Sequence, residues 1–141
     1  MIWELVIFLA GFGQESKSKK VHFNSNKNKS TDQLKIEGLN HHKGGNIELA
    51  KKSYESFIRR GVNDSDVLSN YALISHQTGD TKKALQLYEK CIDIFPNHSF
   101  SCCNLGYLYL TLGEVIKAEQ ATLKALEIDP KLANAHCNLG L

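Results

Sequence analysis

Residues 99–132 read SFSCCNLGYLYLTLGEVIKAEQATLKALEIDPKL, and the chain around them repeats the pattern of this stretch. The pattern returns 34 residues earlier, where Asn70-Tyr71-Ala72 corresponds to Asn104-Leu105-Gly106. Further copies begin at Thr31 and Ala133, and no gap is needed between the first copy and the last residue. A fixed period of about 34 residues is typical of an array of stacked helix–turn–helix units.

Within each copy, the spacing of apolar and small residues predicts two helices. We number positions 1–34 from Thr31, Ser65, Ser99 and Ala133. Positions 4, 7 and 11 carry larger side chains, which form one apolar stripe on a first helix. Two further positions are small, which lets antiparallel helices approach closely: position 8 (Gly38, Ala72, Gly106, Gly140) and position 20 (Ala50, Ala84, Ala118). Glycine at position 15 suits a left-handed helix end, and proline at position 32 ends the second helix.

Together these positions resemble the tetratricopeptide repeat family over residues 31–141, about four-fifths of the chain. The resemblance implies an all-α fold without strands, namely an α-solenoid of antiparallel helix pairs in right-handed superhelical order. We expect three full repeats at residues 31–64, 65–98 and 99–132, and the start of a truncated fourth repeat at residues 133–141.

The ends of the individual helices follow from their caps and stop signals. We expect first helices at residues 33–43, 66–77 and 100–112, and second helices at residues 47–60, 81–94 and 115–128. Thr31 or Asp32 can cap the first helix. Gly61 and Val62 stand where the family usually has Asp-Pro, so the second helix should end at Gly61. Thr122 replaces the family's usual aromatic residue at position 24, and we expect it to loosen the contact between its two helices.

Residues 1–30 differ from the repeats in composition. Met1 to Phe12 is apolar but shorter than the roughly 20 residues that span a bilayer. A secretory signal is an alternative interpretation, although no basic residue precedes the segment and Glu4 interrupts it. Gln14 to Ser30 is rich in Lys, Ser and Asn, so it should be a disordered lead-in. We therefore expect a cytoplasmic protein, with export or membrane association through residues 1–12 as the alternative.

The charge of the repeats bears on the class of partner. The chain has 141 residues, of which 42% are hydrophobic, and a formal net charge of +2. Residues 1–30 hold five Lys and two Glu, whereas residues 31–141 hold 12 basic and 13 acidic residues. The repeats are thus nearly neutral and show no basic stripe, which argues against nucleic acid as a ligand.

No constellation of side chains in the sequence predicts catalysis, and we expect neither a cofactor nor a metal. Asp and Glu are scattered over solvent-facing helix positions, without a phosphate-binding loop or a nucleophile–base pair. His41 and His42 are adjacent, but neighbouring helical residues point about 100° apart and cannot share one ion. The four cysteines lack Cys-x-x-Cys spacing, so we expect free thiols in a reducing compartment.

In the family, the first helix of each pair lines a concave face that holds extended peptides or partner helices. By the family's geometry, positions 2, 5, 6, 9, 12 and 13 point inward. The predicted binding residues are therefore Lys35, His42, Lys43, Ser69, Asn70, Leu73, His76, Gln77, Phe100, Cys103, Asn104, Tyr107, Asn134, Cys137 and Asn138.

Three of these residues, Asn70, Asn104 and Asn138, form a column at position 6 because each lies one period from the next. An amide carries both a donor and an acceptor, so such a column can hold a peptide backbone. Asn-Leu-Gly with this column resembles the repeats that precede the catalytic domain in O-linked N-acetylglucosamine transferases.

The sequence leaves two functions open. One is a non-catalytic protein–protein interaction module that binds a peptide or partner helix on its concave face. The other is the N-terminal substrate-docking array of a larger enzyme, a glycosyltransferase or sulfotransferase, whose catalytic domain lies beyond residue 141. Because the last nine residues are a first helix without its partner, we expect a fragment that frays after about Ala133 and self-associates through its uncapped C-terminus.

Overall fold

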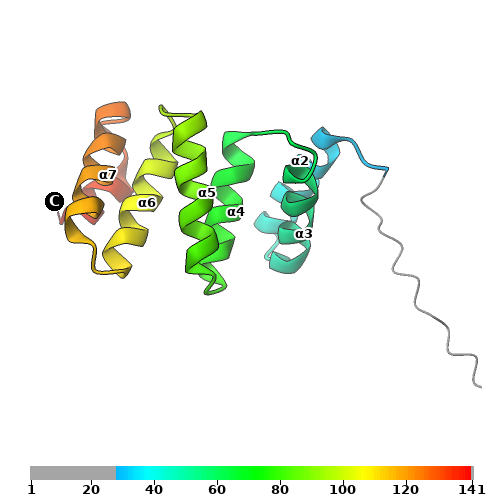
Figure 1. Cartoon of the computed structure of the whole chain (residues 1–141), viewed down its shortest axis with the longest axis horizontal. Coiled ribbons are helices and arrows are strands. Elements are labelled where there is room, and N and C mark those ends of the chain that lie inside the picture. The colour runs from blue at the N-terminus through cyan, green and yellow to red at the C-terminus, as the bar shows by residue number, and fades with distance from the viewer. Residues whose placement is uncertain (1–27, 141) are drawn as a thin grey trace, which may run out of the picture.

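The computed structural model describes residues 28–140, and within this range the chain is helical and contains no strand. Figure 1 shows the helices side by side in a row, with α2 and α3 at one end and α7 and α8 at the other. The helices are α2 (Thr31–Lys43), α3 (Ile47–Ile58), α4 (Ser65–Gln77), α5 (Thr81–Ile94), α6 (Ser99–Thr111), α7 (Val115–Ile128) and α8 (Ala133–Asn138). The prediction of an all-α solenoid of helix pairs is confirmed.

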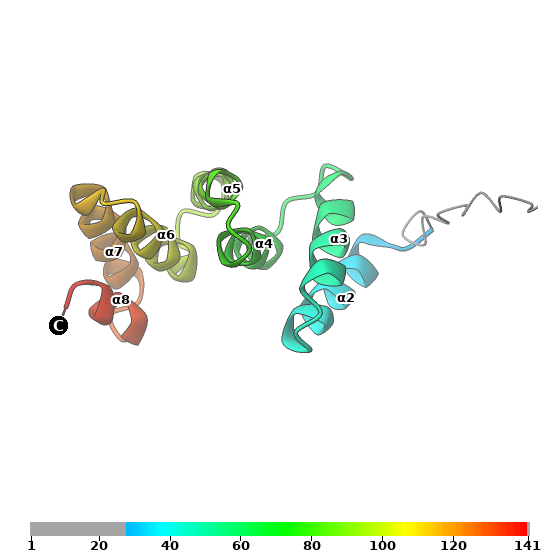
Figure 2. The ribbon, with the colours of Figure 1, turned by 90° about the horizontal axis from the view of Figure 1, so that it is seen from below.

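The helices form an inner and an outer layer. In each pair the first helix packs on the second, α2 on α3, α4 on α5 and α6 on α7. The first helices also contact one another in order, from α2 through α4 and α6 to α8, whereas among the described helices no second helix contacts another second helix. Figure 2 shows α4 and α5 end-on, at different levels of the row. Because the first helices lie closer together, their layer is the inner side of the array.

Glycine and proline end the helices where the sequence predicts. Gly45, Gly79 and Gly113 follow the three first helices with φ values of 74°, 85° and 76°, in the left-handed region that a Cβ disfavours. Two second helices, α5 and α7, have the predicted bounds and stop before a proline. The third, α3, ends at Ile58 instead of the predicted residue 60, and Gly61 follows with φ 74°.

Ser30 caps α2, so the prediction that Thr31 or Asp32 would do so is wrong. Ser30 Oγ accepts a hydrogen bond from the Gln33 N–H at 3.1 Å, and the Ser30 N–H donates to Gln33 Oε1 at 2.9 Å. This reciprocal pair is a capping box, which satisfies two backbone donors at the start of the helix. As a result, α2 begins two residues before its predicted start.

The last residues of the predicted lead-in contact α2. Besides the cap on Ser30, Lys29 Nζ lies 2.6 Å from Glu37 Oε2. The predictions for residues 1–27, including the apolar start at residues 1–12, fall outside the described residues. Within residues 28–140, no helix has the length and apolar character needed to cross a membrane.

The small residues at position 8 contact position 24 of the paired helix. A Cβ on Gly38 would lie 2.7 Å from Tyr54 Cδ1, and a Cβ on Gly106 would overlap Thr122 Oγ1 and lie 3.1 Å from the Ala118 carbonyl oxygen. Thr122 is 1% exposed. The expectation that Thr122 loosens the contact between α6 and α7 is therefore wrong, because the smaller side chain lets the two helices approach more closely.

Candidate functional site

Two neighbouring hollows lie along the inner layer. The first has a volume of about 300 Å³ and is lined by Leu73, His76, Gln77, Tyr88, Asn104 and Tyr107. The second, of about 260 Å³, is lined by Cys103, Asn104, Tyr107, Asn134, Cys137 and Asn138. Because they share Asn104 and Tyr107, they form one groove that runs from α4 across α6 to α8. We call this surface the inner groove.

Nine of the fifteen predicted binding residues line the inner groove. The regular period explains this result, since α4, α6 and α8 present equivalent positions to the same side of the layer. The six that line neither hollow are Lys35, His42, Lys43, Ser69, Asn70 and Phe100.

An aromatic pair lines the first hollow of the groove. The rings of His76 on α4 and Tyr107 on α6 are 5.8 Å apart at an interplanar angle of 55°. Tyr107 is 53% exposed, so a large part of its ring is available to a ligand. An aromatic side chain that is held by a neighbour loses little entropy on binding, which suits an anchor for an apolar or planar group.

Tyr88 is a groove residue that the sequence prediction missed. It is fully buried, and its hydroxyl oxygen has no hydrogen bond within residues 28–140. Burial raises the pKa of Tyr88, and the nearby Asn104 amide opposes this rise. The period assigns Tyr88 to inter-helix packing at position 24. Only its hydroxyl group indicates a role in the groove as well, because a buried phenol needs a hydrogen-bond partner.

The asparagine column is less available than the sequence suggests. The Asn70 amide donates to the Asp66 carbonyl oxygen of its own helix at 2.8 Å. The Asn138 amide donates to the Cys103 carbonyl oxygen at 3.1 Å, and so ties α8 to α6. Asn104 makes no such bond to the described backbone and is the member that both hollows share. The three amides are thus not equivalent as expected: Asn70 and Asn138 bond to backbone carbonyl oxygens, and Asn104 lies between them, beside the Tyr88 hydroxyl.

Lys35 forms an ion pair instead of standing free in the groove. Its Nζ lies 2.7 Å from Asp64 Oδ2 and 3.0 Å from Asp66 Oδ2. Burial alone would lower the pKa of Lys35, but the two carboxylates raise it. The contact joins α2 to the start of α4 and neutralises the lysine, so Lys35 is a poor anchor for an acidic ligand.

The remaining predicted residues lie apart from the hollows or inside the protein. Ser69 is buried at 7% exposure and Phe100 is 56% exposed, with its ring 6.4 Å from His98. His42 is half-buried and Lys43 is exposed near the end of α2. These positions extend the first-helix layer but do not join the groove that α4, α6 and α8 form.

The cysteines differ in exposure. All four are free, and Cys137 alone is exposed. Burial raises the pKa of the Cys91, Cys102 and Cys103 thiols. A buried thiol with a raised pKa reacts slowly, so Cys137 is the cysteine that reagents should modify first. Within the described part of the chain, no three His, Cys, Asp or Glu side chains gather where they could hold a metal ion.

Comparisons with known proteins identify the repeats. Two family models described as tetratricopeptide repeat match the chain, one over residues 65–98 and the other over residues 87–120. No curated protein matches the chain in sequence.

Several solved structures have a similar fold. The structure of MamA gives a TM-score of 0.74 at 19% identity, and the match covers 79% of this chain and 65% of MamA. A tetratricopeptide repeat protein from Parabacteroides merdae gives 0.70 at 28% identity, over 77% of this chain and 43% of that one. The second tetratricopeptide repeat domain of human RPAP3, solved in complex with an HSP70 peptide, gives 0.70 at 22% identity, over 78% of this chain and 92% of that one. The chain thus spans less than two thirds of the first two structures.

Proposed function

Because the chain belongs to the tetratricopeptide repeat family, we propose that it is a non-catalytic protein-interaction module whose inner groove binds a peptide or partner helix. The observation that carries the proposal is the meeting of two hollows at Asn104 and Tyr107, across α4, α6 and α8. A similar domain, from human RPAP3, is bound to an HSP70 peptide. This supports the same use of the fold here.

The length of the groove suggests the size of the ligand segment. Packed helices lie about 8–10 Å apart, so the two intervals from α4 to α8 extend over roughly 16–20 Å. An extended chain rises about 3.3 Å per residue, which corresponds to about five or six residues. The binding segment should therefore be short.

The chemistry of the groove favours backbone and aromatic contacts over charge. Asn104 offers both a donor and an acceptor, and Tyr107 offers an exposed ring. Lys35 is already paired with two carboxylates. We therefore expect ligands selected by an apolar or aromatic side chain near Tyr107, held through backbone bonds to Asn104, without a requirement for an acidic end.

The test starts with peptides selected from a random displayed library on the 141-residue chain. Binding of the selected peptides is then measured for the double variant Asn104→Ala/Tyr107→Ala and for the control Asn40→Ala, an exposed asparagine on α2 away from the groove. The double variant should lose about 2 kcal/mol or more, roughly thirtyfold in Kd, because it removes an amide contact and an aromatic anchor. The control should bind normally.

Cys137 provides a direct footprint of the site. It lines the second hollow and is the exposed cysteine, so a bound peptide should slow its alkylation. If the double variant binds the selected peptides as tightly as the natural chain, and Cys137 stays equally reactive, the binding site lies elsewhere on the protein.

A further inference from the structure

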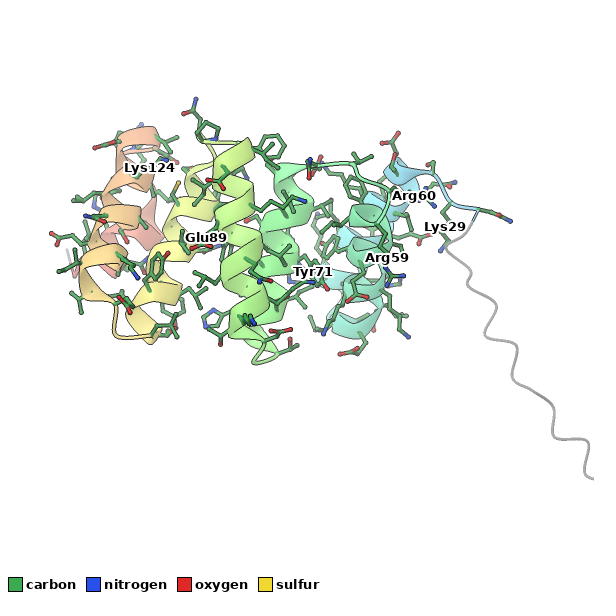
Figure 3. All side chains as sticks on the ribbon, in the orientation of Figure 1. Lys29, Arg59, Arg60, Tyr71, Glu89 and Lys124 are labelled. Atoms are coloured by element: carbon green, nitrogen blue, oxygen red, sulfur yellow. The ribbon has the colours of Figure 1, made fainter. Side chains whose placement is uncertain are left out.

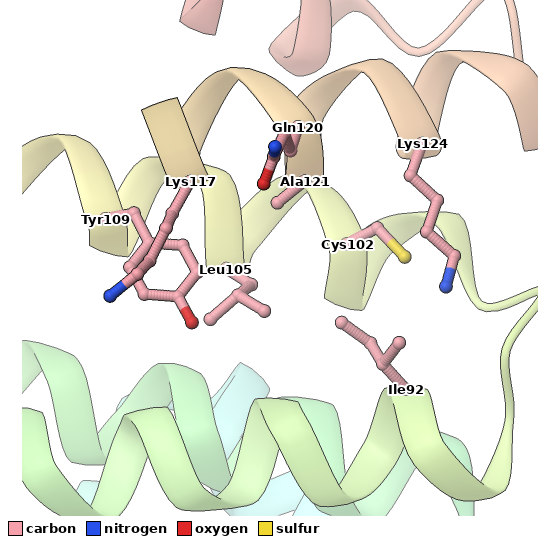
Figure 4. Close-up of a pocket in the computed structure, with 8 residues that line it drawn as sticks. All are labelled: Ile92, Cys102, Leu105, Tyr109, Lys117, Gln120, Ala121 and Lys124. Carbon is pink, nitrogen blue, oxygen red and sulfur yellow. The ribbon is translucent and has the colours of Figure 1, made fainter. Parts of the chain in front are cut away.

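A third hollow lies on the opposite side of α6, between α5 and α7. It has a volume of about 250 Å³ and shares no lining residue with the inner groove. Figure 4 shows Leu105 and Cys102 at its base, Ile92 on α5 facing them, and lysines from α7 at its two ends. We call it the outer pocket.

The base of the outer pocket exists because repeat three carries smaller side chains than repeat two. Cys102, Leu105 and Ala121 line the pocket. The residues one period earlier are larger at all three positions, and all are buried: Leu68, Tyr71 and Leu87. The pocket is therefore specific to one repeat, whereas the inner groove follows from the period.

The rim, in contrast, is unchanged between the two repeats. Ile92, Lys117, Gln120 and Lys124 line the pocket, and the residues one period earlier are of the same types: Ile58, Lys83, Gln86 and Lys90. Repeat two thus serves as an internal reference, in which the same rim surrounds larger side chains. Apart from Tyr109, which stands where repeat two has Ser75, the difference between the repeats lies in the apolar base.

The two lysines at the rim are not equivalent. Lys117 Nζ lies 3.4 Å from Glu114 Oε2 and 5.6 Å from the centre of the Tyr109 ring. The Tyr109 hydroxyl in turn donates to Glu89 Oε1 at 3.2 Å, so acidic groups already stand at this end. Lys124 has no ion pair within residues 28–140, and its charge acts on the Cys102 thiol. Lys124, which projects from α7 in Figure 3, is the stronger anion anchor.

Size and charge spacing define the occupant. An apolar cavity of about 150 Å³ is large enough for benzene, so the outer pocket can take one aliphatic side chain. Alternate side chains of an extended segment point to the same face, about 6.6 Å apart. We propose that the outer pocket binds an extended segment of a protein partner, in which an aliphatic side chain enters the pocket and an acidic residue two positions away pairs with Lys124.

A labelled peptide that contains Asp-Leu-Ala-Glu tests the proposal with the 141-residue chain, by fluorescence anisotropy at low salt. Ala121→Leu fills the pocket with the residue that repeat two has at this position, Leu87. It should weaken binding about tenfold or more, because the leucine of the peptide loses its burial. Lys124→Gln should weaken binding roughly threefold, as expected for an exposed ion pair. Lys90→Gln, the equivalent rim change in repeat two, is the matched control and should leave binding within about twofold.

Peptide controls separate the parts of the proposal. The peptide Asp-Ala-Ala-Glu should bind at least about tenfold more weakly than Asp-Leu-Ala-Glu. The proposal is overturned if the natural chain shows no saturable binding at millimolar concentration, if Ala121→Leu binds equally well, or if free isovalerate competes as strongly as the peptide. Should Ala121→Leu fail to fold by circular dichroism, unchanged binding by the exposed variant Lys124→Gln overturns it. Peptides selected for the inner groove should bind all these variants normally, so the two sites are tested separately.

Discussion

Gly106 is the position at which one added methyl group should disturb the array most. A Cβ there would overlap Thr122 Oγ1 and lie 3.1 Å from the Ala118 carbonyl oxygen and 3.3 Å from the Thr122 backbone nitrogen. Overpacking of this kind costs about 2–3 kcal/mol when backbone atoms cannot move aside. The gain in helix propensity from glycine to alanine offsets about 1 kcal/mol of that cost. Gly106→Ala should therefore lower the free energy of unfolding by about 1–2 kcal/mol.

A double-mutant cycle measured by urea denaturation isolates this contact. Thr122→Ala alone should cost about 1 kcal/mol, since it removes a buried methyl group and a hydroxyl bonded to the Ala118 carbonyl oxygen. Combined with Gly106→Ala, it should recover about 1 kcal/mol relative to the sum of the single changes. Strict additivity would refute the close approach of α6 and α7.

The equivalent glycine of repeat one, Gly38, provides a comparison for Gly106. Gly38→Ala would also meet a paired side chain, but there the close atoms belong to the Tyr54 ring. Repeat two already holds the equivalent combination, with Ala72 at position 8 and Tyr88 at position 24. Gly38→Ala should thus be the milder change of the two glycine substitutions, and a larger loss there than at Gly106 would contradict the argument.

Three further predictions concern stability. Burial raises the pKa of Tyr54 to about 12, so the folded state holds this proton more tightly than the unfolded state does. The free energy of unfolding should therefore fall as pH rises above about 10. Between pH 8 and pH 11, urea denaturation should show a smaller fall in this free energy for Tyr54→Phe than for the natural chain. Burial alone would raise the pKa of Asp64, but its bonds from Lys35 and a backbone N–H lower it. The stability that Asp64 contributes is therefore present above about pH 4 and is lost as pH falls through the folded-state pKa. In Asp64→Asn, the free energy of unfolding should depend less steeply on pH on the acid side. Ser30→Ala should cost about 1 kcal/mol, because the Gln33 N–H loses its acceptor, and amide exchange at the start of α2 should accelerate.

Periodicity predicts the helix pairs of this chain because each structural requirement recurs in several repeats. The bounds of α5 and α7 agree with the sequence prediction to the residue, since a proline follows each of them and no residue near these ends competes for the role. The start of α2 was missed because Ser30, Thr31 and Asp32 can each cap a helix. Only the reciprocal bonds with Gln33 in the structure distinguish Ser30 from its neighbours.

The sequence predicts where the inner groove lies, but it predicts only in part which of its polar groups can bind a ligand. Equal spacing brings Asn70, Asn104 and Asn138 onto one side of the first-helix layer, and this follows from the period alone. Which partner each amide has depends on local contacts that the period does not determine. Asn70 bonds to its own helix and Asn138 to the preceding repeat, whereas Asn104 lies beside the unsatisfied hydroxyl of Tyr88.

One contact between neighbouring repeats recurs in the next repeat, but with a tyrosine at a different repeat position. In repeat two, the Tyr71 hydroxyl donates to Glu55 Oε1 of the preceding repeat at 2.6 Å, and Lys83 lies 5.5 Å from the centre of the Tyr71 ring. Tyr71 is 2% exposed, and Figure 3 shows it between α4 and α3. A neutral donor on a carboxylate is a strong bond, so this group of three side chains ties the second repeat to the first.

Repeat three makes the same contact with the tyrosine one helical turn further along. Glu89 and Lys117 each lie one period after their counterparts, but Tyr109 follows Tyr71 by four residues more than a period. Long Glu and Lys side chains can follow a shift of one turn, about 5.4 Å, so the contact survives while position 7 becomes a leucine. The outer pocket therefore opens without the loss of the tie between repeats, which explains how a repeat can gain a cavity at its base and still stack in register. An alignment that pairs residues by period alone would read the same change as the loss of one tyrosine and the unrelated gain of another.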